Sequence, residues 1–76
     1  MEIGSRIRDI RKKNSMTQDD FATVFGVTRQ TVSHWENGRN YPDMEVLKAI
    51  SDRFNVSFDE LLKDDNELVN YPHLAI

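Results

Sequence analysis

The stretch TRQTVSHWENG, residues 28–38, is rich in side chains that donate and accept hydrogen bonds. Arg pairs well with the guanine edge in the DNA major groove, Gln with the adenine edge, and Ser or Thr with either. Any solvated helix face carries similar residues. The residue types alone therefore leave two interpretations open: a surface that reads bases, and an ordinary solvent-facing helix.

The spacing within this stretch predicts a helix with two different faces. Thr28 is a good N-cap, and Gly38 marks the end of the segment. At about 100° per residue, Val32 and Trp35 fall on one side and the polar side chains on the other. We expect Val32 and Trp35 to anchor the helix in the core while the polar face stays free.

The residues before this helix predict a second short helix that is joined to it by a tight turn. Thr17 is the expected N-cap, with Asp20 at the capping-box position three residues later. Phe21 and Phe25 lie on its inner face with Ala22, and Gly26 ends it. Only residues 26–28 separate the two helices, which is the pattern of a helix-turn-helix unit.

The apolar residues of the flanking segments also have helical spacing. Ile3, Ile7 and Ile10 predict a helix over residues 5–13. A fourth helix opens at Pro42 and Asp43 and ends at Asn55, a plausible left-handed cap. Its expected inner face is formed by Leu47, Ile50 and Phe54.

The fifth predicted helix follows Ser57, which forms a capping box with Glu60. It carries Phe58, Leu61 and Leu62. The predicted fold is therefore all-α, a compact five-helix domain over residues 1–63 with a C-terminal tail, residues 64–76. Two interpretations of the tail stay open: a packed or frayed extension, and a segment for dimerisation or for a protein partner.

The composition fits one globular domain, because 76 residues cannot support two separate cores. No apolar run approaches the roughly 20 residues of a membrane span, so we expect a cytoplasmic protein. The net charge of −3 is unevenly distributed: residues 1–42 carry seven Lys and Arg against five Asp and Glu, and residues 43–76 carry three against eight. Because binding responds to the local field, this acidity does not exclude a nucleic-acid partner.

Catalysis has little support in the sequence. The chain has no Cys, no pair of His residues at metal-ligand spacing and no glycine-rich phosphate loop. His34 and Glu36 lie two residues apart on a helix and point to different sides. We therefore expect no enzymatic activity, no metal site and no cofactor.

Three stretches together resemble the Cro and phage-repressor type of helix-turn-helix family over about residues 3–62. They are RIRDIRKKNSMTQDDFATVFGVT, RQTVSHWENGRNYPD and FNVSFDELL. The resemblance implies five helices, double-stranded DNA as the partner and usually a symmetric homodimer. Phe58, Leu62 and Leu68 are the apolar residues that we expect to contribute to such a dimer.

The resemblance also assigns roles by position. It implies base contacts by Arg29, Gln30, Thr31, Ser33 and His34. It implies phosphate contacts by Gln18, Thr28, Asn37, Arg39 and Asn40, and an ion pair between Arg11 and Glu36. Asp19 and Asp20 depart from the expected charge near Gln18; they either lower the affinity or point away from DNA and favour the start of their helix.

The function predicted from these features is a sequence-specific DNA-binding transcriptional regulator, a repressor that acts as a homodimer on a two-fold operator. The alternative is an antitoxin or a protein-interaction adaptor that keeps the same fold. The acidic second half of the chain and the apolar tail are the features that the alternative would use.

Overall fold

The computed structural model describes residues 3–62, and all regular structure in that range is helical. The helices are α1 (Ile3–Lys13), α2 (Gln18–Phe25), α3 (Arg29–Glu36), α4 (Met44–Phe54) and α5 (Phe58–Leu62). The all-α prediction is confirmed for this part of the chain. None of these helices is long and apolar enough to cross a membrane. The predicted tail, residues 64–76, including Leu68, lies outside the described residues.

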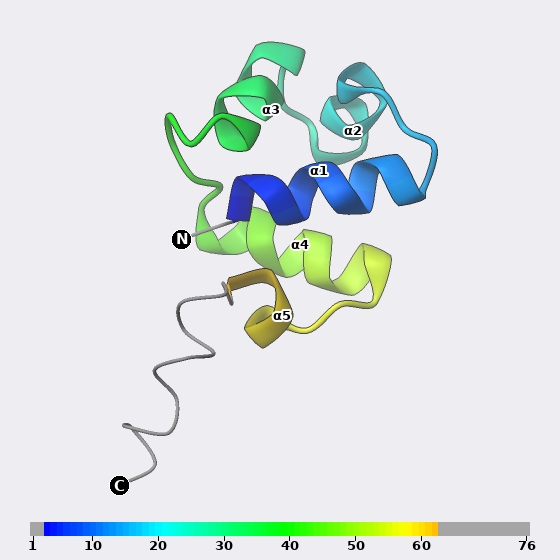
Figure 1. Ribbon diagram of the computed structural model, residues 1–76, viewed down its shortest axis with the longest axis vertical. Coiled ribbons are helices and arrows are strands. Elements are labelled where there is room, and N and C mark those ends of the chain that lie inside the picture. Colours follow the sequence, from blue (N-terminus) through cyan, green and yellow to red (C-terminus); the bar gives the residue numbers. More distant parts are fainter. Residues whose placement is uncertain (1–2, 63–76) are drawn as a thin grey trace, which may run out of the picture.

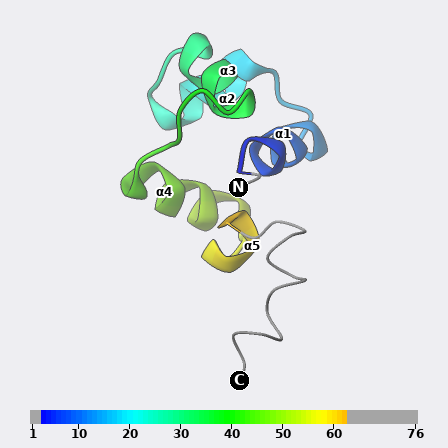
Figure 2. The same ribbon diagram turned by 60° about the vertical axis from the view of Figure 1, so that its left-hand side comes forward.

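The helix α1 runs through the middle of the fold and separates two helix pairs (Figure 1). On one side α2 packs against α3, and on the other α4 packs against α5. The view turned by 60° shows α1 at one side of the fold and a long connection from α3 to α4 (Figure 2). The helix α1 joins the two pairs through its contacts with α3 and α5, and the stacked rings of Phe21 on α2 and Phe54 on α4 also join them.

The helix ends follow the predicted chemistry. The hydroxyl of Thr17 accepts the backbone N–H of Asp20 at 3.0 Å, and the carboxylate of Asp20 accepts the backbone N–H of Thr17 at 3.0 Å. This reciprocal pair is a complete capping box. Gly26 ends α2 at φ 69°, and Asn55 ends α4 at φ 56°, both left-handed as expected.

The first helix begins at Ile3, two residues before the predicted start, so it includes Gly4. A glycine inside a helix is normally unfavourable because of its backbone entropy. Here a side chain would not fit: a Cβ at Gly4 would lie 2.5 Å from the carbonyl oxygen of Trp35 and 2.8 Å from that of Glu36. The backbones of α1 and α3 therefore meet directly at this position.

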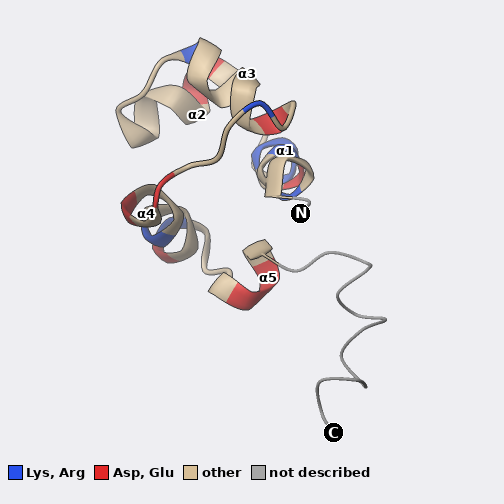
Figure 3. Cartoon of the chain, turned by 90° about the vertical axis from the view of Figure 1, so that its left-hand side faces the viewer, with Lys and Arg blue, Asp and Glu red and all other residues tan. Residues whose placement is uncertain are grey.

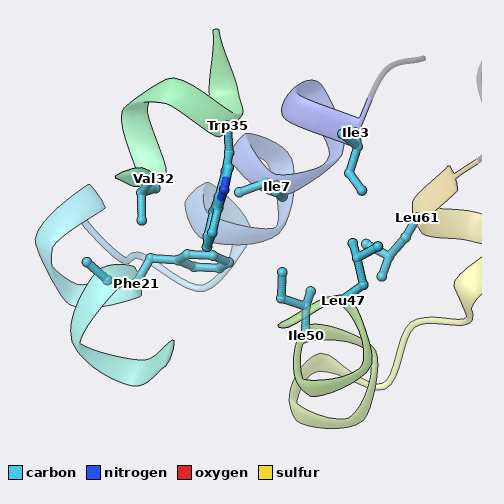
Figure 4. Close-up of a cluster of buried hydrophobic side chains, with 9 residues drawn as sticks. Ile3, Ile7, Phe21, Val32, Trp35, Leu47, Ile50 and Leu61 are labelled. Carbon is cyan, nitrogen blue, oxygen red and sulfur yellow. The ribbon is translucent and has the colours of Figure 1, made fainter. Parts of the chain in front are cut away.

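The core contains side chains from all five helices, and Figure 4 shows them pointing toward a common centre. Val32 is fully buried and Trp35 is 4% exposed, so the predicted anchor of α3 is confirmed. Phe54 was expected to face inward; it is partly buried and stacks on Phe21 with ring centroids 5.8 Å apart. On α5, Leu61 is buried, whereas Phe58 is 36% exposed.

Candidate nucleic-acid interface

The outer face of α3 begins with two exposed side chains. Arg29 and Gln30, in its first turn, are both exposed, while Val32 and Trp35 hold the opposite face in the core. Thr31, Ser33 and His34 are partly buried. The helix therefore presents its N-terminal end most openly, and that end carries the two side chains best suited to paired hydrogen bonds with bases.

The two threonines at the start of α3 are bonded to each other. The Thr28 hydroxyl accepts the backbone N–H of Thr31 at 3.1 Å and lies 2.9 Å from the Thr31 hydroxyl. Thr28 is thus the N-cap of α3, as its position in the sequence predicted. These local bonds fix both hydroxyl groups close to the helix end.

The turn after α3 is an exposed ridge. Asn37, Arg39 and Asn40 are all exposed there. Gly38 adopts φ 76°, and the N–H of Arg39 bonds back to the carbonyl oxygen of His34 at 2.9 Å. The side-chain amide of Asn37 donates to the Ser33 hydroxyl at 3.4 Å. The expected phosphate-contacting residues of this turn therefore lie directly beyond the C-terminal end of α3.

A buried carboxylate at the last residue of α3 links three parts of the chain. The side chain of Glu36 is 1% exposed and accepts two bonds from Arg11, from Nε at 2.8 Å and from Nη2 at 3.1 Å. Arg11 Nη1 also donates to the carbonyl oxygen of Met16 at 3.0 Å. The structure thus brings the expected pair together in the two-pronged geometry that favours Arg and carboxylate.

Two more donors reach the same carboxylate. Gln18 Nε2 lies 3.2 Å from Glu36 Oε1, and Arg8 Nε lies 3.4 Å from that same oxygen. Burial alone raises the pKa of Glu36, but the hydrogen bonds from Arg11 and Gln18 and the charge of Arg11 outweigh it, so the pKa of Glu36 lies below its ordinary value. The bond to Glu36 in turn raises the pKa of Arg11. At neutral pH both groups are charged.

Sequence reasoning missed Arg8 in this network. Its side chain is 45% exposed although its Nε faces the buried carboxylate. The available signal was its spacing from Arg11, because residues three apart on a helix share a face. The bond between Gln18 and Glu36 had no such signal, since the two residues lie on different helices whose contact depends on the fold.

The charges are unevenly distributed over the described residues. Figure 3 shows basic positions along α1 and acidic positions on α5, while α4 carries both signs. The helix α1 carries five Arg and Lys against one acid, Asp9. Asp20 is engaged in the capping box of α2, which favours the interpretation that it supports the helix start. Arg8 and Arg11 therefore lie on the most basic of the five described helices.

Comparison with families of known proteins gives one match that spans most of the chain, the helix-turn-helix family over residues 7–61. The HTH-type transcriptional activator BcrR of Enterococcus faecalis is 40% identical over 65 residues, 86% of this chain and 32% of BcrR. Antitoxin PezA of Streptococcus pneumoniae serotype 4 is 35% identical over 66 residues, 87% of this chain and 42% of PezA. The chain thus spans less than half the length of these two relatives.

A solved structure is similar in both sequence and shape. It is the crystal structure of the P22 c2 repressor protein in complex with a synthetic operator. The two chains have a TM-score of 0.75 and 37% sequence identity, over 86% of this chain and 98% of the other. The similarity therefore covers nearly the whole of that repressor chain.

Proposed function

Because the chain belongs to the Cro and phage-repressor type of helix-turn-helix family, we propose that it is a transcriptional regulator that binds double-stranded DNA. One observation carries the proposal: Arg29 and Gln30 are exposed at the start of a helix whose other face is fixed through Val32 and Trp35. A helix held in this way can enter the major groove with its N-terminal end foremost. The proposed compartment is the cytoplasm.

In the proposed complex α3 lies in the major groove. Arg29 donates two bonds to the O6 and N7 atoms of a guanine, and Gln30 pairs with the N6 and N7 atoms of an adenine. Thr31, Ser33 and His34 make further contacts to bases along the helix. Each good paired contact discriminates against the wrong base by about 1–3 kcal/mol, so Arg29 and Gln30 supply most of the proposed specificity.

Phosphate contacts at both ends of α3 set its orientation. Thr28 serves the start of α3, and Gln18, whose amide is bonded to Glu36, serves the other end together with Asn37, Arg39 and Asn40. Such contacts fix the position of a protein on the duplex without reading its sequence. The acidic helix α5 lies at the end of the fold opposite α3, away from this proposed contact.

We propose that the regulator acts as a homodimer and represses transcription. Two copies of α3 about 34 Å apart would enter successive major grooves of a two-fold operator. The similarity to the P22 c2 repressor supports repression, because a bound dimer blocks polymerase by occupying a promoter. Phe58, 36% exposed, and Leu62, partly buried, are the proposed contributors on α5. Light scattering at micromolar concentration tests the dimer, and a monomer would contradict it.

The similarity to antitoxin PezA favours a second candidate function, an antitoxin or adaptor that binds a protein partner. The acidic positions of α5, Asp59 and Glu60, would serve that partner. The two functions are compatible, because binding through α3 and binding through the opposite side use different surfaces.

Binding to duplex DNA at several salt concentrations tests the main proposal. If the protein neutralises phosphates, the logarithm of the binding constant falls linearly with the logarithm of the salt concentration. Selection of bound sequences from random duplexes should then return a two-fold motif. A protein that fails to bind any duplex at low salt, or whose binding ignores salt, would instead support the protein-binding alternative.

A further inference from the structure

One oxygen atom of Glu36 gathers donors from two other helices. Gln18 Nε2, on α2, lies 3.2 Å from Oε1, and Arg8 Nε, on α1, lies 3.4 Å from it. The two nitrogen atoms therefore cannot be farther apart than the sum of these distances. The Glu36 side chain is 1% exposed, whereas that of Arg8 is 45% exposed. This buried oxygen also accepts a bond from Arg11 Nη2 at 3.1 Å, so it holds three donors, of which Arg8 reaches the surface.

The charge of this cluster is not balanced. Arg11 binds Glu36 through two bonds, at 2.8 Å and 3.1 Å, and its side chain is only 13% exposed, so it neutralises the carboxylate inside the fold. Arg8 bonds to the same carboxylate through one longer bond, and its side chain is 45% exposed. The positive charge of Arg8 therefore remains available to an anion outside.

The carboxylate also fixes the orientation of the Gln18 amide. An ionised carboxylate only accepts hydrogen bonds, so the amide must turn its nitrogen toward Glu36. The opposite orientation would set the amide oxygen against a negative oxygen with no proton between them. The amide nitrogen carries two hydrogen atoms, and the bond to Glu36 uses one of them. The second is left for a further acceptor.

We propose that Glu36 is a positioning residue that holds Gln18 and Arg8 as a two-donor clamp for one DNA phosphate. This adds Arg8 to the proposed DNA contacts, a residue that the sequence pattern had not indicated. A phosphodiester has two unesterified oxygens, one for each donor, and Arg adds the stronger, charge-assisted bond. The inference rests on the proposed DNA binding and adds to it how a phosphate is held at the side of α3.

The first experiment measures duplex binding against salt for Arg8→Met, Gln18→Met and the control Arg53→Met. Arg53 is exposed on α4, so Arg53→Met removes the same charge by the same substitution at a distant site. We expect Arg8→Met to weaken binding about three- to tenfold and to reduce the salt slope by roughly 0.9, the value of one phosphate. Gln18→Met should weaken binding with little change in slope, because an amide carries no charge. Arg53→Met should alter neither quantity.

The second experiment tests the positioning role with a double-mutant cycle. Glu36→Gln is measured alone and in the Gln18→Met protein, at a temperature where circular dichroism shows each variant folded. If Glu36 acts through Gln18, the loss of affinity in the double variant is smaller than the sum of the two single losses. Glu45→Gln, an exposed acid on α4, is the control for the change of charge. If Glu36→Gln does not fold, the cycle of Arg8→Met with Gln18→Met replaces it, since two donors to one phosphate should also be non-additive.

Two results would overturn the clamp while leaving the proposed function intact. One is a salt slope for Arg8→Met equal to that of Arg53→Met, and the other is additive losses in the cycle. A purely structural role of Glu36 predicts the additive result, because it lowers stability without acting through Gln18. The absence of any duplex binding by the unmodified protein at low salt would instead overturn the proposed function.

Discussion

Gly4 lies against the carbonyl oxygen of Trp35 so closely that no side chain fits between them. A Cβ built at Gly4 would be 2.5 Å from that oxygen, and 2.8 Å from the carbonyl oxygen of Glu36. This contact joins the first turn of α1 to the last turn of α3. It sets the distance at which Arg8 and Arg11, farther along α1, reach the carboxylate of Glu36.

Gly4→Ala should destabilise the protein. In an open helix the change would stabilise by about 1 kcal/mol, because Ala has the higher helix propensity. At Gly4 the added methyl group would meet backbone atoms that cannot rotate away, and overpacking of this kind costs about 1–3 kcal/mol. We expect a lower free energy of unfolding in urea. An unchanged or raised midpoint would show that α1 and α3 can separate freely at this point.

Acid should weaken the fold through Glu36. Its pKa in the folded protein is depressed below the unfolded value of about 4.3, despite burial, by the bonds from Arg11 and Gln18. Its stabilising contribution is therefore fully present above the unfolded pKa and is lost as the pH falls through the folded pKa.

Urea unfolding from about pH 6 to about pH 2 tests this prediction. The difference in unfolding free energy between the unmodified protein and Glu36→Gln should shrink across the acidic part of the range. Glu45→Gln is the control for losing one exposed carboxylate. A constant difference between the unmodified protein and Glu36→Gln would mean that the ionised form is not the stabilising one.

Arg29→Ala and Gln30→Ala should each change which sequences are bound. Each substitution should lower the affinity for the selected operator by about 1–3 kcal/mol and relax the base preference at one position in each half-site. Repeating the selection from random duplexes with each variant measures this, with Arg53→Ala as the control. A variant that returns the same motif has lost no residue that reads bases.

Ser15→Gly should stabilise the protein. Ser15 follows α1 at φ 56°, in the left-handed region where a side chain is strained by about 1 kcal/mol. Glycine removes this strain but also loses more entropy on folding, so we expect a net gain of about 0.5 kcal/mol. Asn55→Gly is the matched comparison, because Asn tolerates the same φ better and should gain less. Thermal unfolding of both variants measures the two gains in stability. An Asn55→Gly gain equal to or larger than the Ser15→Gly gain would contradict the strain argument.

Features that depend on neighbouring residues in the chain were predictable from the sequence. The caps at Thr17 and Thr28 and the left-handed ends at Gly26 and Asn55 need only local backbone geometry. The anchor of α3 follows from the helical period, which sets Val32 and Trp35 on one side. The roles of Arg29 and Gln30 at bases stay predictions, because exposure alone does not show what they contact.

Features that depend on how helices meet were not predictable. Gly4 was expected to lie before the first helix, because glycine has a low helix propensity. Its contact with the backbone of α3 arises only when the helices pack, so the sequence did not indicate it. Phe58 has the spacing of a core residue, three positions before Leu61, yet Phe58 is 36% exposed whereas Leu61 is buried, because burial depends on what the other helices cover. Arg8 and Gln18, which both donate to Glu36 Oε1, come from separate helices and have no shared spacing.

The helix α3 keeps its two tasks at opposite ends: Arg29 and Gln30 stand at its start, while Glu36 ties its last residue to α1 and α2. In the proposed complex, exchanging these two side chains would change the operator preference without altering the contacts that hold the helix. Related regulators with the same fold would then come to bind different promoters through few substitutions, and each intermediate sequence would still fold.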